Sequence, residues 1–118
     1  MKQLKQLKGL IPLNHNVKIY VPSTVNVNKA SNNEQQVNNL MAVFSQLFGG
    51  ATTFEAKGAW DSATAGLVVE SITIVESYCS EEQLKKGIDT LIIEAKKLRK
   101  ELKQEAISLE IDNKLYFI

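Results

Sequence analysis

The chain has 118 residues, enough for one domain with a hydrophobic core and too few for two ordinary domains. Its 14 Lys and Arg residues nearly balance 13 Asp and Glu residues, so the net charge of +1 gives no general attraction to duplex nucleic acid. The single cysteine, Cys79, excludes an internal disulfide, and no apolar run reaches the length of a membrane span. We therefore expect a cytoplasmic protein with no membrane partner.

Residues 1–16 are expected to form an N-terminal arm, and residues 17–118 a single domain. The alternation of lysines with apolar residues at the start only faintly resembles a signal peptide or a membrane-surface helix, because Gly9 and Pro12 break the helix early. An isolated arm would expose its apolar side chains, which are Leu4, Leu7, Leu10 and Ile11. The arm is thus expected either to fray or to pack on a neighbouring subunit.

The first part of the domain predicts a strand followed by a helix. Residues 17–21 alternate apolar and polar side chains with the period of a half-buried strand, which Pro22 ends. A polar loop over residues 23–32 then leads to a capping box formed by Ser31 and Glu34. The helix that follows has one apolar stripe at spacings of three and four, made of Val37, Leu40, Met41, Phe44, Leu47 and Phe48.

A glycine pair, Gly49-Gly50, separates this helix from two predicted strands. Because the C-terminal end of a helix repels anions, the pair predicts a left-handed helix cap rather than a phosphate-binding loop. The strands are expected over residues 51–60 and 67–78, with a polar connection over residues 61–66. A β-branched run in the second strand favours a central position in the sheet.

A second helix follows, opened by a capping box of Ser80 and Gln83. It is expected to run from about Glu81 to about Lys103. Its apolar stripe resembles a short coiled-coil seam, but packing on the sheet is the simpler interpretation. The stripe consists of Leu84, Ile88, Leu91, Ala95, Leu98 and Leu102.

The last residues predict a C-terminal hairpin, with strands over residues 107–111 and 115–118 and a tight turn at Asp112-Asn113. The order strand, helix, two strands, helix, strand is that of an α+β ferredoxin-like domain, a split β-α-β sheet with two amphipathic helices on one face. The hairpin adds a strand to this pattern. We expect the domain to form a homo-oligomer through its sheet edge, this hairpin or the N-terminal arm.

The sequence offers no evident set of catalytic or metal-binding residues. His15 is the only histidine, and one His with one Cys makes neither a closed metal site nor a supported Cys-His pair. Cys79 is interpreted as a small buried strand residue, although the helix start that follows it could activate the thiol. The strand carboxylates are interpreted as surface charge, although facing strands could pair two of them as acid and base. They are Glu55, Asp61, Glu70 and Glu76.

The remaining chemistry favours non-enzymatic binding of a small ligand, with no cofactor and no metal. Trp60 ends a glycine-containing strand, where its face could stack on a nucleobase, although core packing is the plainer interpretation. Lys18 and Lys57 are candidates to supply charge for a phosphorylated ligand. Four further candidates carry hydroxyl groups, namely Ser23, Thr24, Thr52 and Thr53. These residues lie on different segments and must converge in the fold or across a dimer interface.

Three stretches of the sequence resemble a small family of uncharacterised phage and mobile-element proteins. They are LFGGATTFEAKGAW at 47–60, VVESITIVESY at 68–78 and QEAISLEIDNKLYFI at 104–118. The resemblance covers most of residues 17–118. Small phage proteins of this type include the Thoeris anti-defence proteins, which bind cyclic nucleotide-like immune signals without cleaving them.

The resemblance implies a non-enzymatic protein in the host cytosol that sequesters a small nucleotide-derived, cyclic immune signal and so blocks anti-phage defence. Trp60, beside lysines and hydroxyl groups, is the feature of the residues that favours such a ligand. The alternative is a protein-protein inhibitor or regulator that docks through an exposed sheet edge. A third possibility, a small enzyme, requires a carboxylate in a cleft or an activated Cys79.

Overall fold

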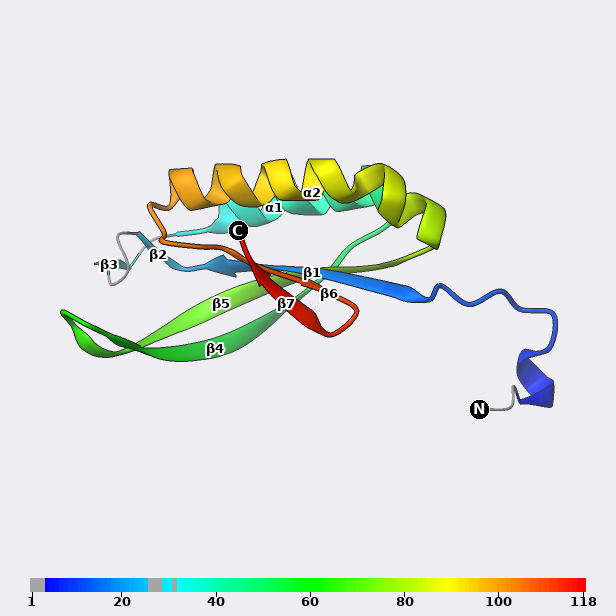
Figure 1. Cartoon of the computed structure of the whole chain (residues 1–118), viewed down its shortest axis with the longest axis horizontal. Helices are drawn as coiled ribbons and strands as arrows, with labels where there is room; N and C mark the ends of the chain where they lie inside the picture. The colour runs from blue at the N-terminus through cyan, green and yellow to red at the C-terminus, as the bar shows by residue number, and fades with distance from the viewer. Residues whose placement is uncertain (1–3, 26–28, 31) are drawn as a thin grey trace.

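Two helices cover one face of a five-stranded antiparallel sheet in the computed structural model, which describes residues 4–25, 29–30 and 32–118 (Figure 1). The elements of the domain are β1 (His15–Pro22), α1 (Glu34–Phe48), β4 (Thr52–Ser62), β5 (Gly66–Cys79), α2 (Glu81–Glu101), β6 (Ser108–Ile111) and β7 (Lys114–Phe117). A short 3₁₀ helix, η1 (Lys5–Leu7), precedes them, and a small ladder of β2 (Thr24–Val25) and β3 (Lys29–Ala30) follows β1.

The strand order β4-β5-β1-β6-β7 confirms the predicted ferredoxin-like arrangement. α1 connects β1 to β4 across β5, and α2 connects β5 to β6 across β1, so each helix makes one crossover of the split β-α-β pattern. The predicted C-terminal hairpin is also confirmed, and its β7 forms one edge of the sheet. Both helices lie on the same side (Figure 1), which we call the helix face, and the other side is the open face.

The hydrophobic core lies between the helix face and the two helices. Val17, Ile19 and Val21 alternate along β1 and are fully buried. From α1, Phe44 packs its ring edge-on against Phe48, with 5.7 Å between the ring centroids. Residues of the α2 stripe join the same cluster. Both apolar stripes predicted from the helical spacing therefore pack on the sheet.

α1 begins later than predicted from the sequence. Its N-cap is Asn33, whose side chain makes no capping bond, and the Glu34 amide instead donates to Asn32 Oδ1 at 2.9 Å. The predicted cap Ser31 lies outside the described residues, and a cap there would start the helix too early. The end of α1 is as predicted, because Gly49 adopts the left-handed conformation with φ of 87°.

α2 begins with the predicted capping box. The Gln83 amide donates to Ser80 Oγ at 3.1 Å, and the Ser80 amide donates to Gln83 Oε1 at 2.9 Å. The helix ends at Glu101, close to the predicted end at Lys103. This cap fixes the direction in which α2 leaves the end of β5.

The β4–β5 hairpin is longer than predicted and extends past the helix layer (Figure 1). Asp61 and Ser62, which were predicted to lie in the connection, are the last residues of β4. β1 pairs with β5 only as far as the Pro22–Ile72 pair, so β4 is the only described strand that pairs in register with residues 66–71 of β5. The free part of the hairpin thus forms a wall beyond the end of β1.

The N-terminal segment extends away from the sheet (Figure 1), and β1 already begins at His15, inside the range predicted for the arm. Its large apolar side chains are exposed, among them Ile11 at 91%. Within the described part of the chain, neither helix has both the length and the apolar character needed to cross a membrane.

Replacing Ser80 with alanine is expected to lower the free energy of unfolding by about 1 kcal/mol, because the first turn of α2 loses the acceptor of its capping box. Urea unfolding followed by circular dichroism measures this change. Ser45→Ala, on the exposed side of α1, is the matched control and should change the free energy by less than about 0.5 kcal/mol. Equal stability of Ser80→Ala and the wild type would contradict the role of the cap.

Candidate functional site

A groove of about 410 Å³ opens between the free part of the β4–β5 hairpin and the connection from α2 to β6. β4 and β5 supply one wall, with Trp60, Glu70 and Ile72, and residues 104–108 supply the other. Phe117 of β7 also lines the groove. A smaller inner part of about 90 Å³ continues beside Tyr20 and Pro22 at the end of β1. We call this whole space the acidic groove.

Aromatic and apolar side chains form much of the surface of the acidic groove. Trp60 is half-buried, whereas Phe117 is 73% exposed. Gly58 allows Ile72 to lie close against β4, since a Cβ atom at position 58 would come within 2.6 Å of Ile72 Cδ1. Flat rings and aliphatic surface of this kind pack against planar heteroaromatic ligands.

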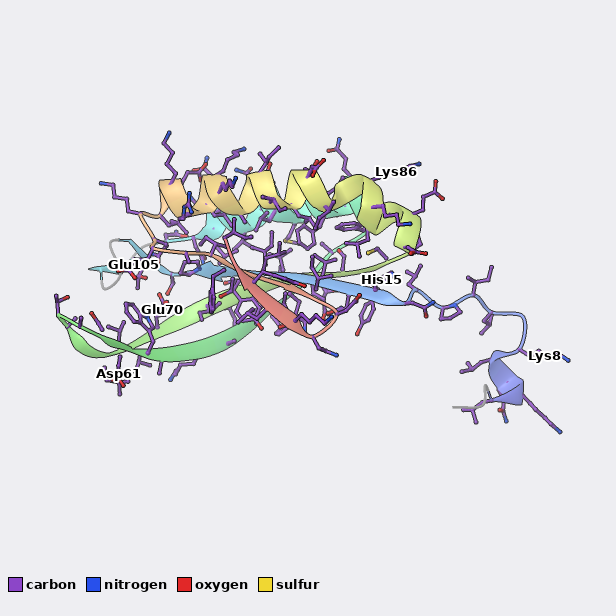
Figure 2. All side chains as sticks on the ribbon, in the orientation of Figure 1. Lys8, His15, Asp61, Glu70, Lys86 and Glu105 are labelled. Carbon is purple, nitrogen blue, oxygen red and sulfur yellow. The ribbon has the colours of Figure 1, made fainter. Side chains whose placement is uncertain are left out.

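Two carboxylates give the groove its charge. Glu70 projects from β5, and Glu105 lies on the opposite wall, in the α2–β6 connection. Figure 2 shows both at the hairpin end of the molecule. Among the described residues that line the groove, none is lysine, arginine or histidine. Carboxylates beside aromatic rings are suited to a ligand that carries both a positive charge and a flat ring.

A polar network lies on the open face next to the inner end of the groove. The Tyr20 hydroxyl donates to Glu110 Oε1 at 2.6 Å, and Lys18 Nζ lies 3.3 Å from Glu110 Oε2 and 3.8 Å from Glu76 Oε2. The bond to Glu110, with burial, raises the pKa of Tyr20 to about 12. The same bond, with the lysine, holds the pKa of Glu110 below its ordinary value. The network fixes the Tyr20 ring against the groove.

Two of the ligand residues predicted from the sequence lie at the acidic groove. Trp60 lines it directly. Thr24 is buried beside it and donates a hydrogen bond from Oγ1 to Glu70 Oε2 at 2.6 Å. Ser23, the neighbouring candidate, donates its hydroxyl to the Ser71 carbonyl at 2.6 Å and so fastens this segment to β5.

The other predicted ligand residues do not come to the groove. Lys18 is held by two carboxylates in the polar network. Lys57 is exposed on the opposite face of β4 from Trp60. Thr52 lies at the far end of β4, in a separate hollow, and Thr53 faces the helix side opposite Val75. The structure therefore does not bring the candidate lysines together with Trp60.

The sequence analysis did not include the two groove carboxylates among the ligand candidates. Glu70 was interpreted as strand-surface charge, yet it pairs in register with Gly58 and lies on the same face as Trp60. The turn of the hairpin contained enough information to place it there, since the register follows from the turn. Glu105 has no such signal, because it lies in an irregular connection whose path depends on the packing of α2 and β6.

The thiol and the histidine lie at the other end of β1. Cys79 is fully buried, as predicted, and burial together with the nearby Asp112 raises the pKa of its thiol, which is the opposite of activation. His15 Nδ1 lies 2.6 Å from Asp112 Oδ2, and this bond holds the pKa of Asp112 below its ordinary value. Within the described ranges, no group of three or more His, Cys, Asp or Glu side chains is placed to hold a metal ion.

The described residues form a small ferredoxin-like domain with a groove whose lining is acidic and aromatic. Its fold is that of two solved structures of a phage SAM lyase. One, in complex with S-methyl-5'-thioadenosine, has a TM-score of 0.68 and 20% sequence identity over 95% of this chain and 94% of that chain. The other, in the apo state, has a TM-score of 0.64 and 21% identity over 89% and 88%. No protein-family model and no curated protein matches the sequence.

These comparisons correct the function expected from the sequence. We predicted a non-enzymatic protein that sequesters a cyclic immune signal, but the fold is shared over nearly the whole chain with an enzyme, a lyase. Both matched structures are of phage proteins, which agrees with the resemblance to phage proteins. Neither supports a relationship to the Thoeris anti-defence proteins.

Replacing Glu110 with glutamine should lower the pKa of Tyr20 from about 12 towards its ordinary value of 10.0, because the charged acceptor of its hydrogen bond is lost. Ultraviolet titration of tyrosinate measures this pKa in a background where Tyr78 and Tyr116 are phenylalanine. Since folding raises the pKa of Tyr20, the bond stabilises the wild type below pH 10, and this contribution is lost as the pH rises through about 12. An unchanged Tyr20 titration in Glu110→Gln would contradict the assignment.

Proposed function

We propose that this chain is a SAM lyase that binds S-adenosylmethionine in the acidic groove and cleaves it to S-methyl-5'-thioadenosine. The observation that carries the proposal is the fold shared with a phage SAM lyase over 95% of this chain. The contents of the groove support it independently, because its aromatic rings and its carboxylates correspond to the two chemical halves of this ligand.

S-adenosylmethionine combines a planar adenine with a sulfonium cation. Trp60 and Phe117 offer aromatic faces for the adenine, and Glu70 and Glu105 offer negative charge for the sulfonium. The volume of about 410 Å³ lies within the range of pockets that bind small molecules, which is about 300 to 1,000 Å³. A groove without a lining lysine or arginine is a poor match for a phosphorylated ligand, so these contents favour a cationic nucleoside.

This cleavage requires few catalytic groups from the protein. Forming S-methyl-5'-thioadenosine breaks the bond between the sulfur and the γ-carbon of the methionine portion. The bonding electron pair passes to the sulfur, which becomes a neutral thioether and needs no proton in order to leave. The main tasks of the groove are to hold the cation and the adenine in a reactive conformation and to keep water away.

Two reactions of the aminobutyrate portion can replace the lost carbon–sulfur bond. Its own carboxylate attacks the γ-carbon and closes a lactone, or a base removes a β-proton and the electron pair forms a carbon–carbon double bond. Glu70 and Glu105 are the groove carboxylates available to accept that proton in the second route. In the first route the same residues position the sulfonium without exchanging a proton.

We also propose that a second copy of the chain covers the apolar surfaces left exposed in this fold. The described N-terminal segment exposes five large apolar side chains, and β7 is an edge strand of the sheet. The exposed side chains of the segment are Leu4, Leu7, Leu10, Ile11 and Leu13, and those of β7 are Leu115, Tyr116 and Phe117. Self-association would remove this surface from water.

Purified protein incubated with S-adenosylmethionine is expected to release S-methyl-5'-thioadenosine, identified by mass spectrometry. Trp60→Ala should weaken binding of both compounds by about tenfold, because stacking on a base contributes about 1–3 kcal/mol. Glu70→Gln should weaken binding of the cationic substrate more than that of the neutral product, because the groove loses a negative charge.

Glu101→Gln, an exposed carboxylate of α2 outside the groove, is the control and should retain wild-type turnover. The identity of the second product, a lactone or an unsaturated amino acid, decides between the two routes. A wild-type protein that neither binds nor cleaves S-adenosylmethionine would contradict the proposed function.

Native mass spectrometry is expected to show a homo-oligomer of the wild type. Replacing both Leu10 and Ile11 with serine should shift the protein towards the monomer, because these side chains lose the apolar surface that drives association. Ile93→Ser, which alters an exposed apolar residue on α2, is the control and should leave the oligomeric mass unchanged. A monomeric wild type at micromolar concentration would contradict self-association.

A further inference from the structure

Thr24 connects the two walls of the acidic groove from a third segment of the chain. It begins β2, immediately after β1 leaves the sheet, and only 7% of its surface is exposed. Its hydroxyl donates to Glu70 Oε2 on one wall at 2.6 Å. Its carbonyl oxygen accepts a hydrogen bond from Gln104 Nε2 on the other wall at 2.8 Å. One buried residue therefore contacts a polar side chain of each wall.

The backbone around Thr24 is itself held in place. The Ser23 amide and hydroxyl both donate to the Ser71 carbonyl of β5, at 3.2 and 2.6 Å. Gln104 also donates to the Leu102 carbonyl at the end of α2, at 3.1 Å. These contacts hold the Thr24 backbone relative to β5 without involving Glu70.

This arrangement selects one orientation of the Glu70 carboxylate. A glutamate on a strand that faces a groove has several accessible rotamers, whereas a short hydrogen bond to its charged group favours one of them. Thr24 bonds Oε2, and within the described part of the chain no group donates to the other oxygen, Oε1, which is therefore available to a ligand in the groove. A carboxylate held at a fixed distance attracts a cation more strongly than one that turns away.

We propose that Thr24 is a positioning residue that holds Glu70 towards the cationic centre of the ligand and so gives the groove its preference for a charged nucleoside over a neutral one. This inference rests on the proposed function, and it adds a residue outside the groove lining to the site. Loss of the Thr24 hydroxyl should therefore affect one class of ligand. Binding of a cation becomes weaker because the negative charge is no longer fixed, whereas stacking of the adenine is unchanged.

Thr24→Val tests the proposal, because it replaces the hydroxyl with a methyl group at nearly constant volume. Calorimetry compares two ligands. One is sinefungin, a cationic analogue in which an amine-bearing carbon replaces the sulfonium, so that it has no carbon–sulfur bond to cleave. The other is neutral S-methyl-5'-thioadenosine. We expect Thr24→Val to weaken sinefungin binding about tenfold and to change binding of the thioadenosine less than about twofold, since the Glu70 carboxylate is then no longer held in one orientation.

Thr73→Val is a matched control, because Thr73 is also buried and donates to a carboxylate, Glu55 Oε1 at 3.0 Å, on the helix face away from the groove. It should leave the ratio of the two affinities unchanged. Thr24→Ser keeps the hydroxyl and should restore the wild-type ratio. Thr24→Ala supplies the same comparison if valine prevents folding, which circular dichroism detects.

Equal weakening of both ligands by Thr24→Val would show a merely structural role and overturn the proposal. Unchanged affinities, or a failure of Thr24→Ser to restore the ratio, would overturn it as well. A wild type that binds neither ligand would overturn the proposed function and this inference with it. A wild type that binds both, with an unaltered ratio in Thr24→Val, would overturn this inference alone.

Discussion

The burial and pairing of β1 is the constraint on which the rest of the structure depends. β1 pairs with β5 on one side and with β6 on the other, and its alternate residues Val17, Ile19 and Val21 are the fully buried centre of the core. The same strand also determines where the groove lies. Its pairing with β5 ends at Pro22, so the hairpin wall and the α2–β6 connection come to face each other beyond it.

The parts of the fold that were predictable are those whose signal is local. A strand with one buried face must alternate apolar and polar residues, and a helix on a sheet must repeat its apolar residues at spacings of three and four. The main elements could therefore be predicted from the sequence. The Ser80 cap and the Gly49 left-handed cap are also local. The start of α1 was not predictable from Ser31, because Asn32 supplies the acceptor for the Glu34 amide instead.

The candidate site was only partly predictable, because it depends on segments far apart in the chain. Trp60 was among the candidates because of its type and its strand. Glu105 was not, since a residue in an irregular connection has no periodicity to indicate its direction. If the proposed function is correct, the expectation of a non-enzymatic protein was wrong because of the type of reaction. A search for nucleophiles, metal ligands and acid–base pairs misses a reaction in which the substrate carries its own leaving group.

Two pairs of carboxylates differ in the charges that surround them. Within the protein, Glu76 and Glu110 share Lys18 as a counter-ion, and the Tyr20 hydroxyl adds a hydrogen bond to Glu110. Among the described residues, Glu70 accepts a hydrogen bond only from the neutral hydroxyl of Thr24, and the groove lining around Glu70 and Glu105 contains no basic residue. The net charge of +1 for the whole chain does not reveal this local excess of negative charge at the groove. Under the proposed function, a cationic ligand supplies to Glu70 and Glu105 the positive charge that Lys18 supplies to Glu76 and Glu110.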